Sequence, residues 1–246
     1  QIAAFYDFAR AADDIADNSD LDPDEKIRRL DAFEYGLDAS SNIPKAATLA
    51  RCLAESRVTD RHARDLLTAF RQDARKSRYA TMSELHGYCA LSASPVGRFL
   101  LDLHGEDAAL YRHSDPLCDA LQILNHLQDI SDDFASLDRV YLPADLMAAQ
   151  GATESDLAGA RSTAGMRAVI DACLDECDRL IAAAALLPLK LADRRLAANS
   201  AVILRLAARL SRRLRRQDPL AGRVALSRTD FLIAGVTGLV AGVAKL

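Results

Sequence analysis

The chain has 246 residues, a formal net charge of −4 at pH 7 and a pI near 5.8. This acidic balance argues against a general nucleic-acid binder, which needs a basic surface to neutralise phosphates. Half of the residues are hydrophobic, yet only 5% are aromatic and tryptophan is absent. A core rich in alanine and leucine favours packed helices over sheets, because these residues are strong helix formers and weak strand formers.

The cysteines are odd in number, are scattered along the chain and form no CxxC pair. This pattern is typical of free buried thiols in a reducing compartment, so we expect a cytoplasmic protein. Peripheral contact with the inner face of the membrane stays open as an alternative. The five cysteines are Cys52, Cys89, Cys118, Cys173 and Cys177.

Apolar residues recur at helical spacing almost throughout the chain. Prolines and capping residues divide the pattern; for example, Thr81 and Glu84 have the spacing of a capping box. No strand alternation stands out, so we predict one all-α domain of roughly ten helices. The apolar tail 231–246 is shorter than a membrane-spanning helix, which needs roughly 20 residues, and is expected to close an apolar cavity or to contact an interface. The expected helices cover residues 1–17, 22–36, 42–55, 59–76, 81–92, 96–104, 116 through the acidic residues at 129–133, 154–187 and 188–216.

The first predicted helix carries an acidic cluster at Asp13, Asp14 and Asp17. Residues three and four apart share a helix face, so Asp13 and Asp17 point the same way. Such like charges repel unless a cation lies between them. Arg10 precedes Asp13 and Asp14 by three and four residues and can pair either with them or with a phosphate.

A second acidic cluster lies in the middle of the chain. Asn125, Asp129 and Asp133 are spaced four residues apart, so all three are expected on one helix stripe. Gln128 and Asp132 fall toward the side of that stripe. A solvated helix face would explain either cluster alone, but two acidic stripes, each with an arginine nearby, favour a binding site.

Arg139 and Tyr141 follow closely behind the second cluster. Two acidic stripes turned toward each other would present the oxygen ligands that Mg²⁺ prefers, and Mg²⁺ commonly bridges carboxylates to substrate phosphates. The sequence therefore predicts chemistry on a diphosphate.

These motifs resemble those of the squalene/phytoene synthase family of head-to-head prenyl transferases. Within that family the chain is most similar to the bacterial hydroxysqualene synthases of hopanoid biosynthesis. The matching stretches for the family are residues 10–17, 88–89, 95–97, 125–133 and 139–143, and those for the subfamily are 70–81, 94–98 and 218–223.

The resemblance implies a single isoprenoid-synthase helical bundle around a central cavity, spanning residues 1–246 and lacking the N-terminal segment of the family. It also implies roles for individual residues. The implied metal ligands are Asp13, Asp14, Asp17, Asn125, Asp129 and Asp133. The implied catalytic residues are Asp13, Asp17, Asp129, Asp133 and Tyr88. The implied substrate contacts are Arg10, Lys76, Arg78, Tyr88, Asn125, Gln128, Arg139 and Tyr141.

The resemblance further implies Mg²⁺-dependent conversion of presqualene diphosphate to hydroxysqualene, in which water quenches the carbocation. NADPH is not expected, because hydroxysqualene synthases use water where squalene synthases use hydride. The aromatic residue usual near Leu91 is absent, which weakens a complete squalene reaction. The alternatives are condensation of two farnesyl diphosphates, a phytoene-type reaction, or a non-catalytic helical partner with a relic metal site. Partner enzymes of the squalene pathway are a further open expectation.

Overall fold

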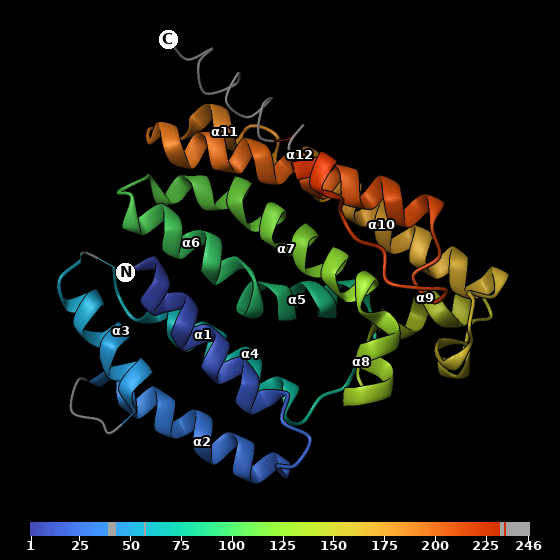
Figure 1. Cartoon of the computed structure of the whole chain (residues 1–246), viewed down its shortest axis with the longest axis horizontal. Helices are drawn as coiled ribbons and strands as arrows, with labels where there is room; N and C mark the ends of the chain where they lie inside the picture. Colours follow the sequence, from blue (N-terminus) through green and yellow to red (C-terminus); the bar gives the residue numbers. More distant parts are fainter. Residues whose placement is uncertain (39–42, 57, 232–233, 235–246) are drawn as a thin grey trace.

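The computed structural model describes residues 1–38, 43–56, 58–231 and 234, and these form a helical protein (Figure 1). The α-helices are α1 (Ile2–Ala16), α2 (Pro23–Tyr35), α3 (Pro44–Ala54), α4 (Arg61–Asp73), α5 (Met82–Ser92), α6 (Ser94–Leu103), α7 (Tyr111–Gln128), α8 (Ile130–Leu137), α9 (Ala144–Ala149), α10 (Ala164–Ala184), α11 (Leu187–Lys190) and α12 (Arg194–Arg216). Short 3₁₀ turns cover Gly36–Asp38, Ala108–Leu110 and Glu154–Ala158. Two short strands, β1 (Arg78–Tyr79) and β2 (Val140–Pro143), complete the elements.

The helices form three groups in space (Figure 1). Helices α1 to α4 pack on one side around a cluster of buried apolar residues, and α10 to α12 lie on the other side. Between them lie α5, α6 and α7, of which α7 packs against α6, α10 and α12. The rings of Phe5 on α1 and Phe99 on α6 stack with centroids 4.0 Å apart, which joins the first group to the middle one. The predicted all-α class is confirmed.

Local signals in the sequence explain several helix starts. Asp22 caps α2 by accepting a hydrogen bond from the backbone N–H of Glu25 at 2.9 Å, and Thr81 caps α5 by accepting from Glu84 at 3.2 Å. The predicted capping box is completed differently, because the Glu84 carboxylate accepts from the N–H of Ala80 instead of that of Thr81.

The expected helix start at Pro116 is wrong. Helix α7 begins at Tyr111, directly after a 3₁₀ turn, and Pro116 lies inside it. A proline within a helix removes one backbone hydrogen bond and usually marks a boundary. Here the packing of α7 between its neighbours outweighs that local cost.

The two long helices expected over 154–187 and 188–216 are also shorter than predicted. The first begins only at Ala164, where Thr163 accepts a hydrogen bond from Met166 N–H. The second is divided, because the Asp193 side chain accepts from the N–H groups of Arg195 and Leu196 and starts α12 there. Helical periodicity alone does not reveal such a cap between two apolar runs.

Strands β1 and β2 pair in parallel and were not predicted. A two-residue strand shows no alternation, so the sequence has no signal for it. The hydrogen bond from Val140 N–H to Ser77 O, 2.8 Å long, fixes the start of β2 beside the end of α4. This pairing carries Arg139 into the interior of the molecule.

All five cysteines are free thiols, but the expectation that they are buried holds only for Cys89, Cys173 and Cys177, since Cys52 and Cys118 are partly exposed. None of the helices within the described ranges is both long enough and apolar enough to span a bilayer. The expectation for the tail 231–246 falls almost wholly outside the described residues.

Candidate functional site

The first acidic cluster lies at the C-terminal end of α1. Asp13 is partly buried and Asp14 is exposed, and Arg10 forms ion pairs with both, at 3.1 and 2.9 Å. Burial raises the pKa of Asp13 to about 6, and the neighbouring Asp17 carboxylate adds to that rise. The pairing of Arg10 with the aspartates is confirmed, and the crowding of carboxylates leaves a site that a cation would stabilise.

The second cluster spans a break between two helices, so the prediction of one continuous helix is wrong there. Asp129 lies between α7 and α8 with φ −103° and ψ 13°. The hydrogen bonds from Asp129 N–H to Asn125 O and from Asp133 N–H to Asp129 O, 3.0 and 2.8 Å long, nevertheless keep helical spacing. Asn125, Asp129 and Asp133 therefore remain in one row, as predicted.

The segment that follows α12 closes over this second cluster. Arg223 Nη2 lies 3.0 Å from Asp129 Oδ1, although that oxygen has no partner with hydrogen-bond geometry. Burial raises the pKa of Asp129, and Arg223 opposes that rise. Gln128 donates from Nε2 to Val224 O at 2.5 Å. Sequence reasoning placed Arg223 in a matching stretch but did not assign it to the site.

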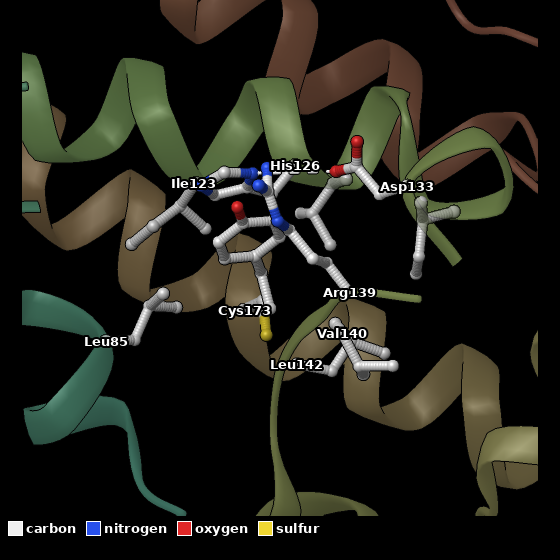
Figure 2. A pocket seen from close by; sticks show the side chains of 11 residues that line it. Leu85, Ile123, His126, Asp133, Arg139, Val140, Leu142 and Cys173 are labelled. Atoms are coloured by element: carbon white, nitrogen blue, oxygen red, sulfur yellow. Dashed lines mark ion pairs between the residues drawn. The ribbon is translucent and has the colours of Figure 1, made fainter. Parts of the chain in front are cut away.

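Arg139 connects the two clusters. Its side chain is buried, and Nη1 lies 2.5 Å from Asp17 Oδ1 while Nη2 donates to Ala16 O at 3.0 Å. On its other side Arg139 shares the lining of a water-sized cavity with Asp133 and His126. Figure 2 shows these three side chains gathered in one place. Asp17 of the first motif thus pairs with a guanidinium group that lines the same cavity as Asp133 of the second motif.

Asp73 is a site residue that sequence reasoning missed. It is buried at the end of α4 and accepts hydrogen bonds from the hydroxyls of Tyr88 and Tyr141, at 2.8 and 3.4 Å. Burial raises its pKa to about 7. A signal existed, since Asp73 follows Phe70 by three residues and so continues the buried face of α4.

An aromatic cluster surrounds Asp73. The rings of Tyr79, Tyr88 and Tyr141 lie with centroids 5.4 to 5.6 Å apart. His126 stacks on Tyr141 with centroids 3.5 Å apart, and its Nδ1 lies 3.7 Å from Asp133 Oδ2. His126 therefore packs beside the acidic row.

Lys76 and Arg78 lie near the site but are engaged by carboxylates. Lys76 pairs with Glu84, and its ammonium lies 4.6 Å from the centroid of the Tyr79 ring. Arg78 makes a bidentate pair with Glu154, with contacts of 2.7 and 2.8 Å, and a further pair with Asp138 at 2.6 Å. Their roles as substrate contacts stay predictions.

Beside Arg139 lies a polar cavity of about 410 Å³. Four basic and two acidic residues contribute to its lining: Lys26, Arg75, Lys76 and Arg139, and Asp73 and Asp138. The Lys26 ammonium donates to Ala16 O at 2.8 Å, and burial, followed by the nearby Arg139, lowers its pKa. This excess of positive charge suits an anionic group.

A larger, mainly apolar cavity of about 590 Å³ lies among α6, α7 and α12, with Ile2 of α1 at its wall. Leu117 and Leu121 of α7 line it, and Asn125 and Asp129 continue their row by steps of four. Helix α1 therefore carries a cavity-lining residue at one end and the first acidic cluster at the other, and the cavity-lining residues of α7 precede the second acidic cluster, which begins at the end of that helix. On α1 the two ends are about 16 Å apart at 1.5 Å per residue.

The donor chemistry of the two clusters fits Mg²⁺. The side chains offer hard oxygen ligands, and the buried Asp129 Oδ1 has no partner with hydrogen-bond geometry. Burial, followed by repulsion from the Asp17 carboxylate, raises the pKa of Asp13, and a bound cation would offset both effects. Within the described residues no three histidine, cysteine, aspartate or glutamate side chains are close enough together to hold one ion. The two clusters thus offer ligand types that suit Mg²⁺.

The family model described as squalene/phytoene synthase matches residues 1–230. A hydroxysqualene synthase from Rhodopseudomonas palustris is 44% identical over 234 residues, covering 95% of this chain and 80% of that protein. The crystal structure of squalene synthase HpnC from Alicyclobacillus acidocaldarius is similar with a TM-score of 0.78 and 32% identity, covering 87% of this chain and 81% of that one. A dehydrosqualene synthase structure with a TM-score of 0.78 and 22% identity, covering 97% and 85%, shares the fold. The predicted isoprenoid-synthase architecture is confirmed.

Proposed function

Because the chain belongs to the squalene/phytoene synthase family, whose members act on prenyl diphosphates, we propose that it converts presqualene diphosphate to hydroxysqualene. Relatives named hydroxysqualene synthase are 38 to 44% identical over most of the chain. The observation that carries the proposal is the arrangement of α1 and α7, with acidic residues toward one end and an apolar cavity toward the other. A diphosphate suits the first end, and isoprenoid tails suit the second.

The reaction begins when the C–O bond to the diphosphate breaks and the electron pair leaves with the diphosphate. Mg²⁺ bound by Asp13, Asp17 and the row of Asn125, Asp129 and Asp133 would neutralise charge on that leaving group. Asp14 is the remaining candidate ligand. The protein's own cations also stabilise the diphosphate electrostatically. The basic side chains proposed to contact the diphosphate are Arg10, Lys76, Arg78 and Arg139, and Gln128 is a proposed polar contact.

The cyclopropylcarbinyl cation left behind rearranges and is then attacked by water. The electron-rich ring faces of Tyr88 and Tyr141 are suited to stabilise positive charge nearby. Addition of water forms a new C–O bond and releases one proton. We assign that proton to Asp73, reached through the Tyr88 hydroxyl, because a carboxyl group with a pKa of about 7 can accept and release protons near neutrality.

Water rather than NADPH is the proposed source of the quenching group. The aromatic residue usual near Leu91 in squalene and phytoene synthases is absent, and Leu91 packs against the core to which α5, α7 and α10 contribute. This substitution supports the hydroxylated product over squalene.

The test uses the purified full chain with Mg²⁺ and either presqualene diphosphate or farnesyl diphosphate, with and without NADPH. Products are identified by mass spectrometry. We expect hydroxysqualene from presqualene diphosphate without NADPH. Turnover of farnesyl diphosphate alone would support condensation and overturn the assigned reaction. No turnover under any condition would support a non-catalytic helical partner.

A further inference from the structure

The last turns of α12 carry a dense group of arginines. A pocket of about 370 Å³ is lined there by Arg209, Arg212, Arg213, Arg216 and Gln217. We call it the α12 basic pocket. Positive side chains near a helix C-terminus are stabilised by the helix dipole, but that effect does not require them to gather around a concave space.

Two of the four arginines form ion pairs within the protein. Arg209 and Arg213 both pair with Asp230, a carboxylate with no exposed surface. Arg213 also donates to Ala225 O and to Ser227 Oγ, each at 3.2 Å. These contacts hold the segment after α12 against the helix.

The other two arginines of the pocket are not balanced. Arg212 and Arg216 are exposed, and neither has an acidic partner among the residues that the structure describes. Four arginines therefore face one aspartate at this pocket. An anionic ligand would complete the charge balance, because guanidinium groups bind phosphate oxygens in bidentate fashion.

An exposed apolar side chain follows the residue that pairs with Arg209 and Arg213. Phe231 follows the anchored Asp230 and is 54% exposed. From residue 231 to residue 246 the sequence contains a single charged side chain, Lys245. Unbalanced arginines next to apolar residues are the composition of surfaces that bind at the headgroup level of a bilayer.

We propose that the α12 basic pocket is a docking surface for an anionic lipid bilayer. The headgroup phosphates enter the pocket and contact Arg212 and Arg216, while Phe231 inserts at the interface. The net charge of −4 means that the remaining surface does not attract anions in general, so the attraction is local. This inference stands independently of the proposed reaction.

The test measures co-sedimentation of the full chain with vesicles of phosphatidylcholine alone and of phosphatidylcholine with phosphatidylglycerol. We expect binding to the anionic vesicles only. The double substitution Arg212→Gln with Arg216→Gln should weaken it about 30-fold, which corresponds to about 2 kcal/mol at roughly 1 kcal/mol per arginine. The matched control is Arg51→Gln with Arg112→Gln, which removes two exposed arginines that have no carboxylate partner within the described chain and should leave binding unchanged.

Two further measurements sharpen the test. Circular dichroism and thermal melting of both double variants establish that they fold, and Phe231→Ala should weaken vesicle binding without changing its dependence on anionic lipid. Equal binding of the native chain to both kinds of vesicle, equal losses in the two double variants, or no binding at all would each overturn the proposal. Turnover in detergent should be the same in the native chain and in Arg212→Gln with Arg216→Gln, so failure of the docking surface is distinct from failure of the reaction.

Discussion

Arg139 is buried, and the Asp17 carboxylate is its acidic partner. A buried charge that loses its partner costs about 3–5 kcal/mol, but Asp17 is 38% exposed, and solvent screening reduces that cost here. Asp17 is therefore expected to serve two roles, as a metal ligand and as the partner of Arg139. Substitutions must separate these roles.

We expect Asp17→Ala and Asp129→Ala to lower kcat on the order of 100-fold or more, because each removes a proposed ligand for the charge that stabilises the leaving group. Helix content measured by circular dichroism should stay near that of the native chain. Asp17→Asn, which keeps an oxygen for Arg139, should restore stability but not activity. The control Asp7→Ala changes an exposed carboxylate on the same helix. Unfolding of both alanine variants would instead make the clusters structural.

Asp73 provides a pH-dependent prediction. Its pKa is raised to about 7 from 3.8, so the folded protein holds this proton over a range where the unfolded chain has lost it. Protonated Asp73 therefore contributes about 4 kcal/mol to the free energy of unfolding below about pH 4. This contribution is lost as the pH rises through 7. Asp73→Asn, which cannot ionise, should lack this loss.

The measurement is urea unfolding of the native chain and of Asp73→Asn at pH 5 and pH 8. Asp13 also has a raised pKa, so only the difference between the two proteins isolates Asp73. Parallel pH dependence in both would contradict the assignment of the raised pKa to Asp73.

For single residues, the sequence predicts the spacing of charged side chains along a helix well, but it does not predict which side chains tertiary contacts bury. The rows of Asp13 with Asp17 and of Asn125 with Asp129 follow directly from helix periodicity. Asp73 and His126 gain their environment from Tyr88 and from other residues distant in sequence. Spacing within one helix carries no information about such contacts.

At the scale of elements, the close approach of α6 and α7 depends on Gly97. A Cβ atom at this position would overlap Ser114 Oγ and lie 2.6 Å from Cys118 Sγ. Both neighbours belong to α7, and Gly97, Ser114 and Cys118 all line the apolar cavity. The glycine therefore sets the spacing of two cavity walls.

We expect Gly97→Ala to destabilise the fold by about 1–3 kcal/mol through overpacking. Gly87→Ala is the matched control, since a Cβ there meets nothing within 4 Å and alanine favours a helix interior. Adding Ser114→Ala to Gly97→Ala should recover part of the loss by removing one clashing atom. The free energy of unfolding of the native chain and of the three variants is measured by chemical denaturation. Equal stabilities for Gly97→Ala and Gly87→Ala would refute the close approach of α6 and α7.

Helix boundaries show which local signals are sufficient. Asp22 and Thr81 cap helices where the sequence predicts them, because an N-cap acts within a few residues. Pro116 lies within α7, and Asp193 divides a predicted helix, because packing and capping compete there. The β1–β2 pair depends on a contact between segments about 60 residues apart, which no local pattern reveals.

At the scale of the whole molecule, α1 and α7 connect the apolar cavity to the two acidic clusters, since each helix lines the cavity before the chain reaches a cluster. The cavity, at about 590 Å³, falls within the roughly 300–1,000 Å³ usual for ligand pockets. Its size should limit which isoprenoid tails are accepted. Leu121 is well placed for a test, because it lines the cavity one turn before Asn125.

Leu121→Phe should fill part of the cavity and discriminate against long tails. We expect kcat/KM for presqualene diphosphate to fall about tenfold, since one or two lost apolar contacts are worth roughly 1–3 kcal/mol, while an analogue with shortened tails should be affected much less. Leu121→Ala is the complementary variant. It should raise the ratio of kcat/KM for the long substrate to kcat/KM for the short one relative to Leu121→Phe, but the enlarged cavity should lower its stability. Steady-state kinetics with both substrates measure the ratio. An equal fall for long and short substrates would mean that the cavity does not hold the tails, and the proposed division between an acidic end and an apolar end would then be wrong.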